Sequence, residues 1–391
     1  MLKAALFSDG TREYRIPEEP ECGENVKIRF RTGAGDVDHV YAVIRDGGNR
    51  NECRRLELEK AETAGRFDFY ERTIQLGETP LIYDFEVVKG DEVCHYNRLG
   101  VSEPGGMDAS FVITPGFHVP EWAKGALMYQ IFVDRFNNGD PTNDVLGDEY
   151  VYIGFPVTKV EKWNEQLSVL DVDRFYGGDI QGIWDKLGYL QSLKVEVLYL
   201  SPVFVSPSNH KYDCQDYEHI DPHYGVIVKD EGELVAADAS DNRNAKRYSV
   251  RTSDRENLAA SDAFFARFVQ EVHKRGMRII LDGVFNHCGS FNKWMDREKI
   301  YEKDGGYEPG AYLSADSPYR DFFLFKDAND WPDNDSYEGW WGHNTLPKLN
   351  YEGSEKLYQY VLDIAKRWLS PPYSIDGWPL DVAADLGHSP E

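Results

Sequence analysis

The fold of this chain is decided by two stretches that each end an apolar run on an aspartate, Ile279-Ile280-Leu281-Asp282-Gly283-Val284-Phe285-Asn286-His287 and Ile375-Asp376-Gly377-Trp378-Pro379-Leu380-Asp381. A helical apolar pattern precedes each stretch: Phe264, Phe265, Phe268, Val269 and Val272 before the first, and Leu357, Val361, Ile364 and Trp368 before the second. Helices that alternate with buried strands are typical of a parallel sheet. An isolated aspartate after a strand more often caps the next helix. Two at corresponding strand ends predict instead the catalytic face of a (β/α) barrel.

Composition limits the function classes. The chain has 391 residues and a formal net charge of −25, which disfavours nucleic acid and anionic membranes as partners because both would be repelled. The five cysteines form no C-x-x-C pair, so neither a disulfide framework nor a zinc site is predicted. No apolar run is long enough to cross a membrane, and the first residues lack the apolar core of a signal peptide. A cytoplasmic location is therefore expected.

Two domains are predicted, a β-sandwich over residues 1–118 and a barrel domain over 119–391. Short alternating strands separated by glycine-containing turns favour the sandwich. They centre on Val26, Ile28 and Phe30, on Val40, Ala42 and Ile44, on Phe67 and Phe69, and on Tyr83, Phe85 and Val87. In the second domain, strands at 128–132 and 195–200 with a helix between them (Ile183, Leu187, Leu190, Leu193) join the two units above. Insertions are expected at about 226–257, which is polar and without period, and at 288–350.

Six segments in order resemble the signature regions of the α-amylase superfamily of retaining glycosidases (glycoside hydrolase family 13). They are Tyr129-Gln130-Ile131-Phe132-Val133-Asp134-Arg135-Phe136, Ser208-Asn209-His210-Lys211-Tyr212-Asp213, Ile220-Asp221-Pro222-His223-Tyr224-Gly225, Asp282-Gly283-Val284-Phe285-Asn286-His287, Trp340-Trp341-Gly342-His343-Asn344-Thr345-Leu346-Pro347-Lys348-Leu349-Asn350 and Gly377-Trp378-Pro379-Leu380-Asp381-Val382-Ala383. Together with the leading β domain they are similar to the neopullulanase, cyclomaltodextrinase and maltogenic amylase branch. In that branch the leading domain is a starch-binding-type sandwich that often helps the enzyme dimerise.

The resemblance implies a role for each matched residue. Asp381 would be the nucleophile of a double displacement, which needs a second, protonated carboxyl about 5 Å away. His287 and Asn286 would bind the sugar in the cleaved subsite, and Tyr212 would be its aromatic platform. Asp282 would order the catalytic carboxylates and contribute to substrate binding. Against these roles, His287 could only pack beneath the site, and a tyrosine taken out of its motif would carry no such meaning.

The resemblance also implies a calcium ion. The turn Asn138-Gly139-Asp140-Pro141-Thr142-Asn143-Asp144 is rich in the hard oxygen donors that calcium prefers. Clusters of this composition are more often plain turns. The related branch places calcium on the equivalents of Asn138, Asp140, Asn143, Asp144, Gly177 and Asp179. No organic cofactor is expected.

Two departures from the family pattern change the expected activity. Position 379 holds arginine in the family, where its cation orients the nucleophile and keeps it ionised; here it is Pro379, and a severe loss of activity is predicted. The family's acid/base glutamate follows the fifth barrel strand, and no matching segment is present. Asp385 lies too close behind Asp381 to replace it. We therefore expect four strands of eight, in one part of a longer or two-piece protein.

The interpretation from sequence is an incomplete (β/α)8 barrel behind a β-sandwich, from an enzyme that hydrolyses α-1,4-glucans such as malto-oligosaccharides, cyclodextrins, pullulan or starch. The stretch alone should bind sugar weakly and turn it over poorly or not at all. A glucan-binding pseudoenzyme and a 4-α-glucanotransferase on the same scaffold are the alternatives. Expected partners are the glucan, a second copy through the first domain, or a second fragment that completes the barrel.

Overall fold

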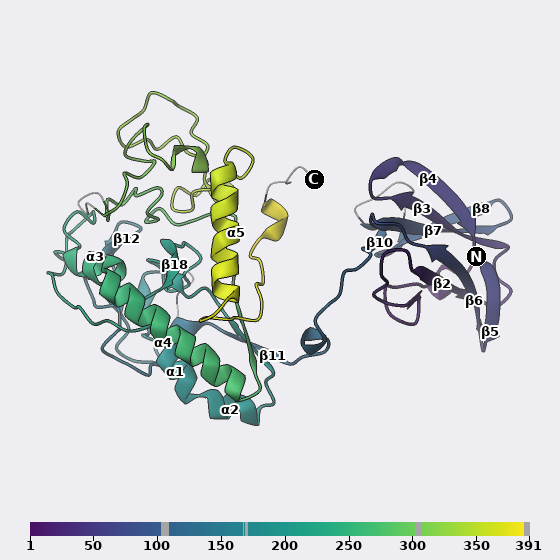
Figure 1. Ribbon diagram of the computed structural model, residues 1–391, viewed down its shortest axis with the longest axis horizontal. Coiled ribbons are helices and arrows are strands. Elements are labelled where there is room, and N and C mark those ends of the chain that lie inside the picture. Colours follow the sequence, from purple (N-terminus) through teal and green to yellow (C-terminus); the bar gives the residue numbers. More distant parts are fainter. Residues whose placement is uncertain (103–108, 167, 169–170, 302–305, 387–391) are drawn as a thin grey trace. The chain divides into compact units, whose positions relative to one another are not determined.

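The computed structural model describes residues 1–102, 109–166, 168, 171–301 and 306–386. The chain forms two compact units, Met1–Lys124 and Gly125–Glu391, against a predicted boundary at residue 118. Both units are visible in Figure 1. Within the described residues, no helix combines the length and the apolar character that a bilayer crossing needs.

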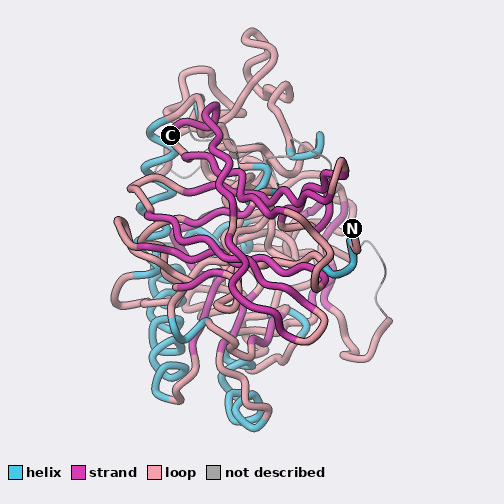
Figure 2. The backbone as a smooth tube through the Cα atoms, turned by 90° about the vertical axis from the view of Figure 1, so that its right-hand side faces the viewer, coloured by secondary structure: helices cyan, strands magenta, loops and turns pink. Residues whose placement is uncertain are grey.

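The first unit is a sandwich of two antiparallel sheets, and Figure 2 shows that strands make up most of it. One sheet has the order β1 (Arg15–Ile16), β2 (Asn25–Gly33), β6 (Phe67–Gln75) and β5 (Glu59–Ala64). The other has the order β4 (Asn49–Glu57), β3 (His39–Asp46), β7 (Leu81–Lys89), β8 (Glu92–Asn97) and β9 (Gly100–Ser102), with β10 (Phe111–Ile113) on β7. Phe30 from one sheet packs on Phe85 from the other, with ring centroids 4.6 Å apart. The predicted sandwich is thus confirmed.

The inward face of β6 differs from the sequence prediction. Asp68 and Tyr70 point into the sandwich, and Phe67 and Phe69 are only partly buried on the opposite face. The guanidinium of Arg29 lies 4.2 Å from the ring centre of Phe69, which gives that ring a cation–π partner outside the core. Alternation along one strand predicts which residues share a face, but not which face is buried.

The second unit contains a parallel sheet in the order β11 (Met128–Ile131), β16 (Val197–Leu200) and β19 (Arg278–Leu281). Residues 375–381 run parallel to β19 through the bridges Ile280 to Gly377 and Gly283 to Leu380. The helices are α1 (Ile180–Asp185), α2 (Leu187–Ser192), α3 (Lys246–Ser253), α4 (Arg255–Lys274) and α5 (Glu355–Leu369). The smaller strands are β12 (Val151–Tyr152), β13 (Phe155–Pro156), β14 (Thr158–Lys159), β15 (Arg174–Phe175), β17 (Phe204–Val205) and β18 (Asp216–Ile220). This is the expected partial barrel.

Proline interrupts the fourth strand of this sheet. The amide of Leu281 donates to the Gly377 carbonyl, Gly283 donates to Pro379 at 2.8 Å, and Asp381 donates back to Gly283 at 3.1 Å. In a parallel ladder the next rung would run from residue 379 to the Leu281 carbonyl, and proline has no N–H to donate. The segment therefore pairs through isolated bridges, as expected for proline inside a sheet.

The long helices confirm the apolar patterns that predicted them. In α4, Phe264, Phe265, Phe268, Val269 and Val272 are all buried. In α5, Leu357, Ile364 and Trp368 are buried, and the Ser354 hydroxyl caps the helix by accepting from the Leu357 amide. Earlier in the chain, the single helix expected around Leu187 is two short helices that meet at Lys186, and Leu193 is exposed beyond them.

The predicted insertion at 226–257 is partly helical, which corrects the sequence interpretation. Helix α3 and the first turn of α4 lie within it. Arg251 of α3 is almost fully buried, and its guanidinium pairs with Glu149 at 2.9 Å and with Asp230 at 2.8 Å. A helix held by buried ion pairs has no apolar period, so the pattern could not show it. By contrast, the described part of 288–350 contains only short 3-10 turns at Arg320–Phe322 and Trp340–Gly342 and isolated bridges.

Candidate active site

Asp282 directly follows β19 and gathers two tyrosines. Its backbone amide donates to the Leu200 carbonyl at 3.1 Å, which fixes it at the carboxyl end of the sheet. Its Oδ2 accepts hydrogen bonds from the hydroxyls of Tyr199 at 3.0 Å and of Tyr212 at 2.8 Å. The structure thus joins Asp282 and Tyr212, 70 positions apart, in one polar cluster. Tyr199 is a third member that the sequence interpretation missed.

Asp381 ends the neighbouring segment and is half-buried. Burial, and then the negative charge of Asp282, raise the pKa of Asp381. Burial also raises the pKa of Asp282, and the two tyrosine hydroxyls only partly oppose this shift. Among the described residues neither carboxylate forms an ion pair, so nothing replaces the cation that position 379 would carry in the family. Both carboxyl groups therefore hold their protons more strongly than a free aspartic acid does.

Asn286 and His287 follow Asp282 closely in sequence and are each about 1 % exposed. In the described part of the chain, the Nε2 of His287, the Oδ1 of Asn286 and the Oδ1 of Asp282 are buried without a hydrogen-bond partner. An unpaired buried polar atom costs about 1–3 kcal/mol, so such groups are usually satisfied. Three together after one strand indicate a polar site that water or a bound molecule would complete.

A stack of aromatic rings leads from His287 to the surface. The ring of Trp340 is parallel to that of His287, with centroids 5.0 Å apart, and Trp341 stacks on Trp340 at 5.2 Å. The indole nitrogen of Trp340 donates to Asp385 at 3.0 Å, so Asp385 positions this ring. Trp340 and Trp341 lie in one of the signature segments, but no role was predicted for them because nothing local in the sequence indicates which ring they contact.

The predicted calcium ligands converge, with one exception. Asn138 donates to Asp144 at 2.7 Å and Asn143 to Asp179 at 3.1 Å, whereas the Oδ1 atoms of both asparagines are buried without a partner in the described chain. Gly177 has a φ of 82°, and an added Cβ would meet the Asp144 carboxylate at 2.4 Å. The described residues contain no cluster of three His, Cys, Asp or Glu side chains placed for a metal. Amide oxygens would have to complete the set.

Asp140 differs from the other predicted ligands. Its carboxylate accepts from the amide and the hydroxyl of Thr142, at 3.0 and 2.6 Å, and so closes its own turn. Only its backbone amide reaches the cluster, where it donates to Asp179. The ammonium of Lys159 lies 2.6 Å from Asp144 and already supplies one positive charge. The oxygen-rich set fits a hard cation, with Asp140 holding the loop.

Comparison with known proteins decides the family. Residues 130–239 and 260–391 match the model described as alpha amylase, catalytic domain, and residues 1–113 match alpha amylase, N-terminal ig-like domain. The chain belongs to the α-amylase family. Its relatives include a cyclomaltodextrinase of Thermoanaerobacter pseudethanolicus, 31 % identical over 99 % of this chain and 58 % of the relative, and neopullulanase 2 of Thermoactinomyces vulgaris, 30 % identical over 100 % and 57 %.

Solved structures of the α-amylase family agree. A cyclomaltodextrinase superposes with a TM-score of 0.56 at 27 % identity, covering 99 % of this chain and 57 % of its own. The intracellular maltogenic amylase of Bacillus subtilis is 31 % identical in sequence over 94 % of this chain and 54 % of its own length. The chain therefore spans little more than half the length of these relatives. The predicted family and the predicted branch are confirmed.

The buried histidine of this α-amylase family site should make stability depend on pH. Burial lowers the pKa of His287 to about 4. In the unfolded chain the group takes up its proton near pH 6.5. Between about pH 6.5 and 4 the unfolded state thus binds more protons, and the free energy of unfolding should fall by about 3 kcal/mol from this residue as the pH drops. Urea unfolding at several pH values measures this.

The matched variants are H287Q and H343Q. Replacing buried His287 should flatten the dependence between pH 6.5 and 4, whereas replacing His343, an exposed histidine of the same unit, should leave it unchanged. His210 is partly buried and its pKa is also lowered by burial, so the variant should keep a residual slope in the same direction. A full slope in H287Q would show that this histidine charges freely in the folded state.

Proposed function

We propose that the protein carrying this chain hydrolyses α-1,4-glucosidic bonds in malto-oligosaccharides, cyclodextrins, pullulan and starch by a retaining double displacement. The observation that carries the proposal is the group of Asp381, Asp282, Tyr212, Asn286 and His287 at the carboxyl end of the sheet. In the described chain, Asp282, Asn286 and His287 each have a buried polar atom without a partner. The names of the relatives support the substrate class.

The residues divide the work as follows. Asp381 attacks the anomeric carbon and forms a glycosyl-enzyme, which water then hydrolyses. Tyr212 offers its ring to the apolar face of the sugar while its hydroxyl is held by Asp282. His287, neutral because its pKa is lowered, and Asn286 hydrogen-bond the sugar hydroxyls. The proton for the leaving oxygen comes from a glutamate outside these residues, so residues 1–391 alone bind sugar without efficient turnover.

Product analysis tests this function. The full-length gene product should open β-cyclodextrin and cleave maltotriose, and proton NMR should show the α-anomer as the first product, because two inversions retain configuration. Residues 1–391 alone should show no turnover under the same conditions. The β-anomer as first product would contradict a retaining mechanism. Products longer than maltotriose would indicate a 4-α-glucanotransferase.

One observation favours a second candidate, a glucan-binding protein without turnover. Burial and the charge of Asp282 raise the pKa of Asp381, and Pro379 offers no cation to form an ion pair with it. The full-length gene product would then bind maltotriose and release no product over hours. The same assay separates the two candidates, because the binding groups Tyr212, Asn286 and His287 are kept in both.

Calcium is proposed as a structural ion on Asn138, Asn143, Asp144, Gly177 and Asp179. When bound it supplies positive charge that ties the loop at 138–144 to the start of α1. Asp179 is the N-cap of α1, so the ion would also hold this helix. We expect Ca²⁺ to raise the Tm of the protein by several degrees, and EDTA to reverse the rise.

Two variants make the calcium test specific. N138A removes a buried oxygen that lacks a partner and should abolish the calcium-dependent rise in Tm. D185N changes an exposed carboxylate of α1 and should keep it. Scanning calorimetry of both variants, with and without CaCl₂, measures the change in Tm. A CaCl₂ concentration of about 1 mM is suitable because it is on the order of the Kd of the weaker protein calcium sites. Equal Tm values with Ca²⁺ and EDTA in the unmodified protein would contradict the proposal.

A further inference from the structure

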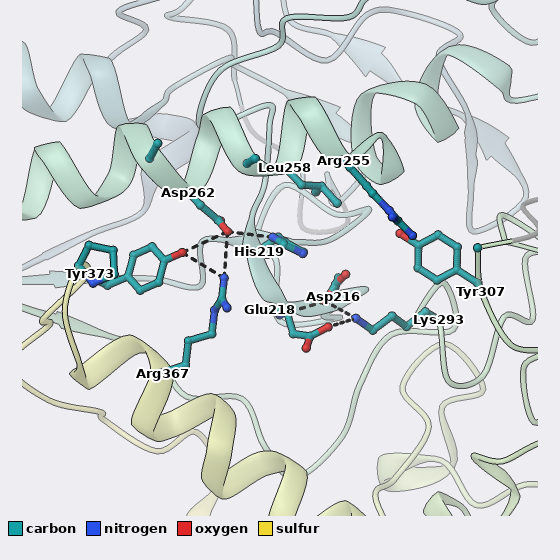
Figure 3. A pocket seen from close by; sticks show the side chains of 14 residues that line it. Asp216, Glu218, His219, Arg255, Leu258, Asp262, Lys293, Tyr307, Arg367 and Tyr373 are labelled. Carbon is teal, nitrogen blue, oxygen red and sulfur yellow. Dashed lines mark hydrogen bonds and ion pairs between the residues drawn. The ribbon is translucent and has the colours of Figure 1, made fainter.

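A second cavity, of about 600 Å³, opens between α4 and α5, and it shares no residue with the candidate active site. Figure 3 shows its walls: Leu258 and Asp262 from α4, Glu218 and His219 from β18, Arg367 from α5, and Tyr373 from the loop after α5. Its volume is within the range of about 300–1,000 Å³ that small-molecule sites occupy. Neither the proposed hydrolysis nor the proposed calcium site uses this cavity.

Most charged groups of the wall are paired with one another; the exception is Arg255, which is exposed and has no ion pair among the described residues. Lys293 is largely buried and contacts both Asp216, at 2.9 Å, and Glu218. Across the cavity, Asp262 accepts from His219 at 2.9 Å and from Arg367 at 3.2 Å (Figure 3). The wall has three carboxylates and three permanent cations, which balance one another. Burial lowers the pKa of His219, but its hydrogen bond to Asp262 and the charge of Asp216 outweigh that effect and raise it. At Lys293 and Arg367 an ion of either sign would meet a like charge or displace an existing partner, which leaves Arg255 as the one cation of the described wall outside these pairs.

The same groups leave hydrogen-bonding capacity for an uncharged ligand. His219 uses Nδ1 toward Asp262, and its Nε2 has no partner in the described chain. The ion pairs hold the three carboxylates and the Arg367 guanidinium in fixed orientations, so a hydroxyl group can join them with little reordering. Tyr373 donates to Asp262 at 3.4 Å, which fixes its ring at the edge of the cavity.

Apolar surface lies beside these polar groups. Leu258, Ala259 and Ala263 line the cavity from one face of α4, and Pro372 and Tyr373 line it from the loop after α5. A neutral molecule that carries hydroxyl groups around its edge and C–H groups on its faces matches this combination. Hexopyranoses have that form.

We infer that this cavity is a second saccharide site, which takes one or two neutral hexose units away from Asp381. The class of ligand follows from the cavity itself. The choice of an α-glucan as the probe rests on the proposed function. A site of this kind would hold a long glucan at a second point while another part of it occupies the active site.

Saturation-transfer difference NMR with maltotriose tests the inference in four variants. Y212A weakens the active site and should leave a residual maltotriose signal from the cavity. Adding A263W, which fills the cavity from an exposed position of α4, should remove that residual signal. Adding Q270W instead, at an exposed position of the same helix that does not line the cavity, should leave it unchanged. Circular dichroism checks that each variant is folded.

The outcomes separate this site from the proposed function. Loss of all binding in Y212A, or a residual signal that A263W does not reduce, overturns the second site. If A263W alone removes binding and Y212A has no effect, the second site stands and the proposed active site fails. In the Y212A variant, glucose should bind more tightly than glucosamine or gluconate. The reverse order would contradict the charge-neutral assignment.

Discussion

Replacing Pro379 with arginine should raise the turnover of the full-length gene product on maltotriose by a factor on the order of 100. The reason is electrostatic. Asp381 and Asp282 both have raised pKa values, and each is affected by burial without a compensating cation among the described residues. A guanidinium at position 379 would favour the ionised carboxylates and hold Asp381 by a bidentate contact.

Three substitutions separate the effects that Pro379 combines. P379A restores an N–H for the Leu281 carbonyl without adding charge, so it should stabilise the sheet and leave the rate low. P379K adds a positive charge but lacks the planar guanidinium that can bind a carboxylate through two hydrogen bonds, so it should recover only part of the rate. P379R should recover most of it and lower the pKa of Asp381, as followed by carbon NMR of the carboxyl group. If P379R gave no gain in rate, the assignment of Asp381 as a nucleophile that needs this cation would be wrong.

Replacing Asp381 with asparagine should abolish turnover, with a loss in kcat of about 10⁴-fold or more. The loss should be measured in the P379R variant, because its turnover is expected to be high enough for a loss to be detected. An amide is not a nucleophile, so no glycosyl-enzyme can form. KM should change only a few-fold, because Tyr212, Asn286 and His287 remain. A fluorosugar that forms a slow glycosyl-enzyme should label the peptide that contains Asp381.

Asp385 provides the matched control for this loss. It lies four residues further on, and it accepts a hydrogen bond from Trp340. D385N should therefore change substrate binding modestly, through the Trp340 ring that stacks on His287, and leave the fluorosugar label on Asp381. A loss of kcat in D385N as large as in D381N would mean that Asp385 takes part in the chemistry.

The residues brought together at the site were only partly predictable. Asp282, Asn286 and His287 follow one strand, so their proximity is a local property of the sequence. Tyr212 was found through its signature segment, and the structure places its hydroxyl on Asp282. Tyr199 was missed although it stands one residue before the end of β16, where side chains alternate between the two faces of the sheet. A tyrosine near the carboxyl end of a predicted strand was the signal in the sequence that could have placed Tyr199 at the site.

The sequence by itself determined the features in which apolar residues repeat at a regular local spacing. Apolar residues at helical spacing predicted α4 and α5, and the apolar runs before Asp282 and Asp381 predicted parallel strands, because buried faces repeat along the chain. Only the tertiary structure decided the rest: which face of β6 is buried, the helix α3 held by Arg251, the stack of Trp340 on His287, and the cavity around Asp262. Each depends on polar or aromatic partners distant in sequence, and such pairings leave no period in the residues that make them.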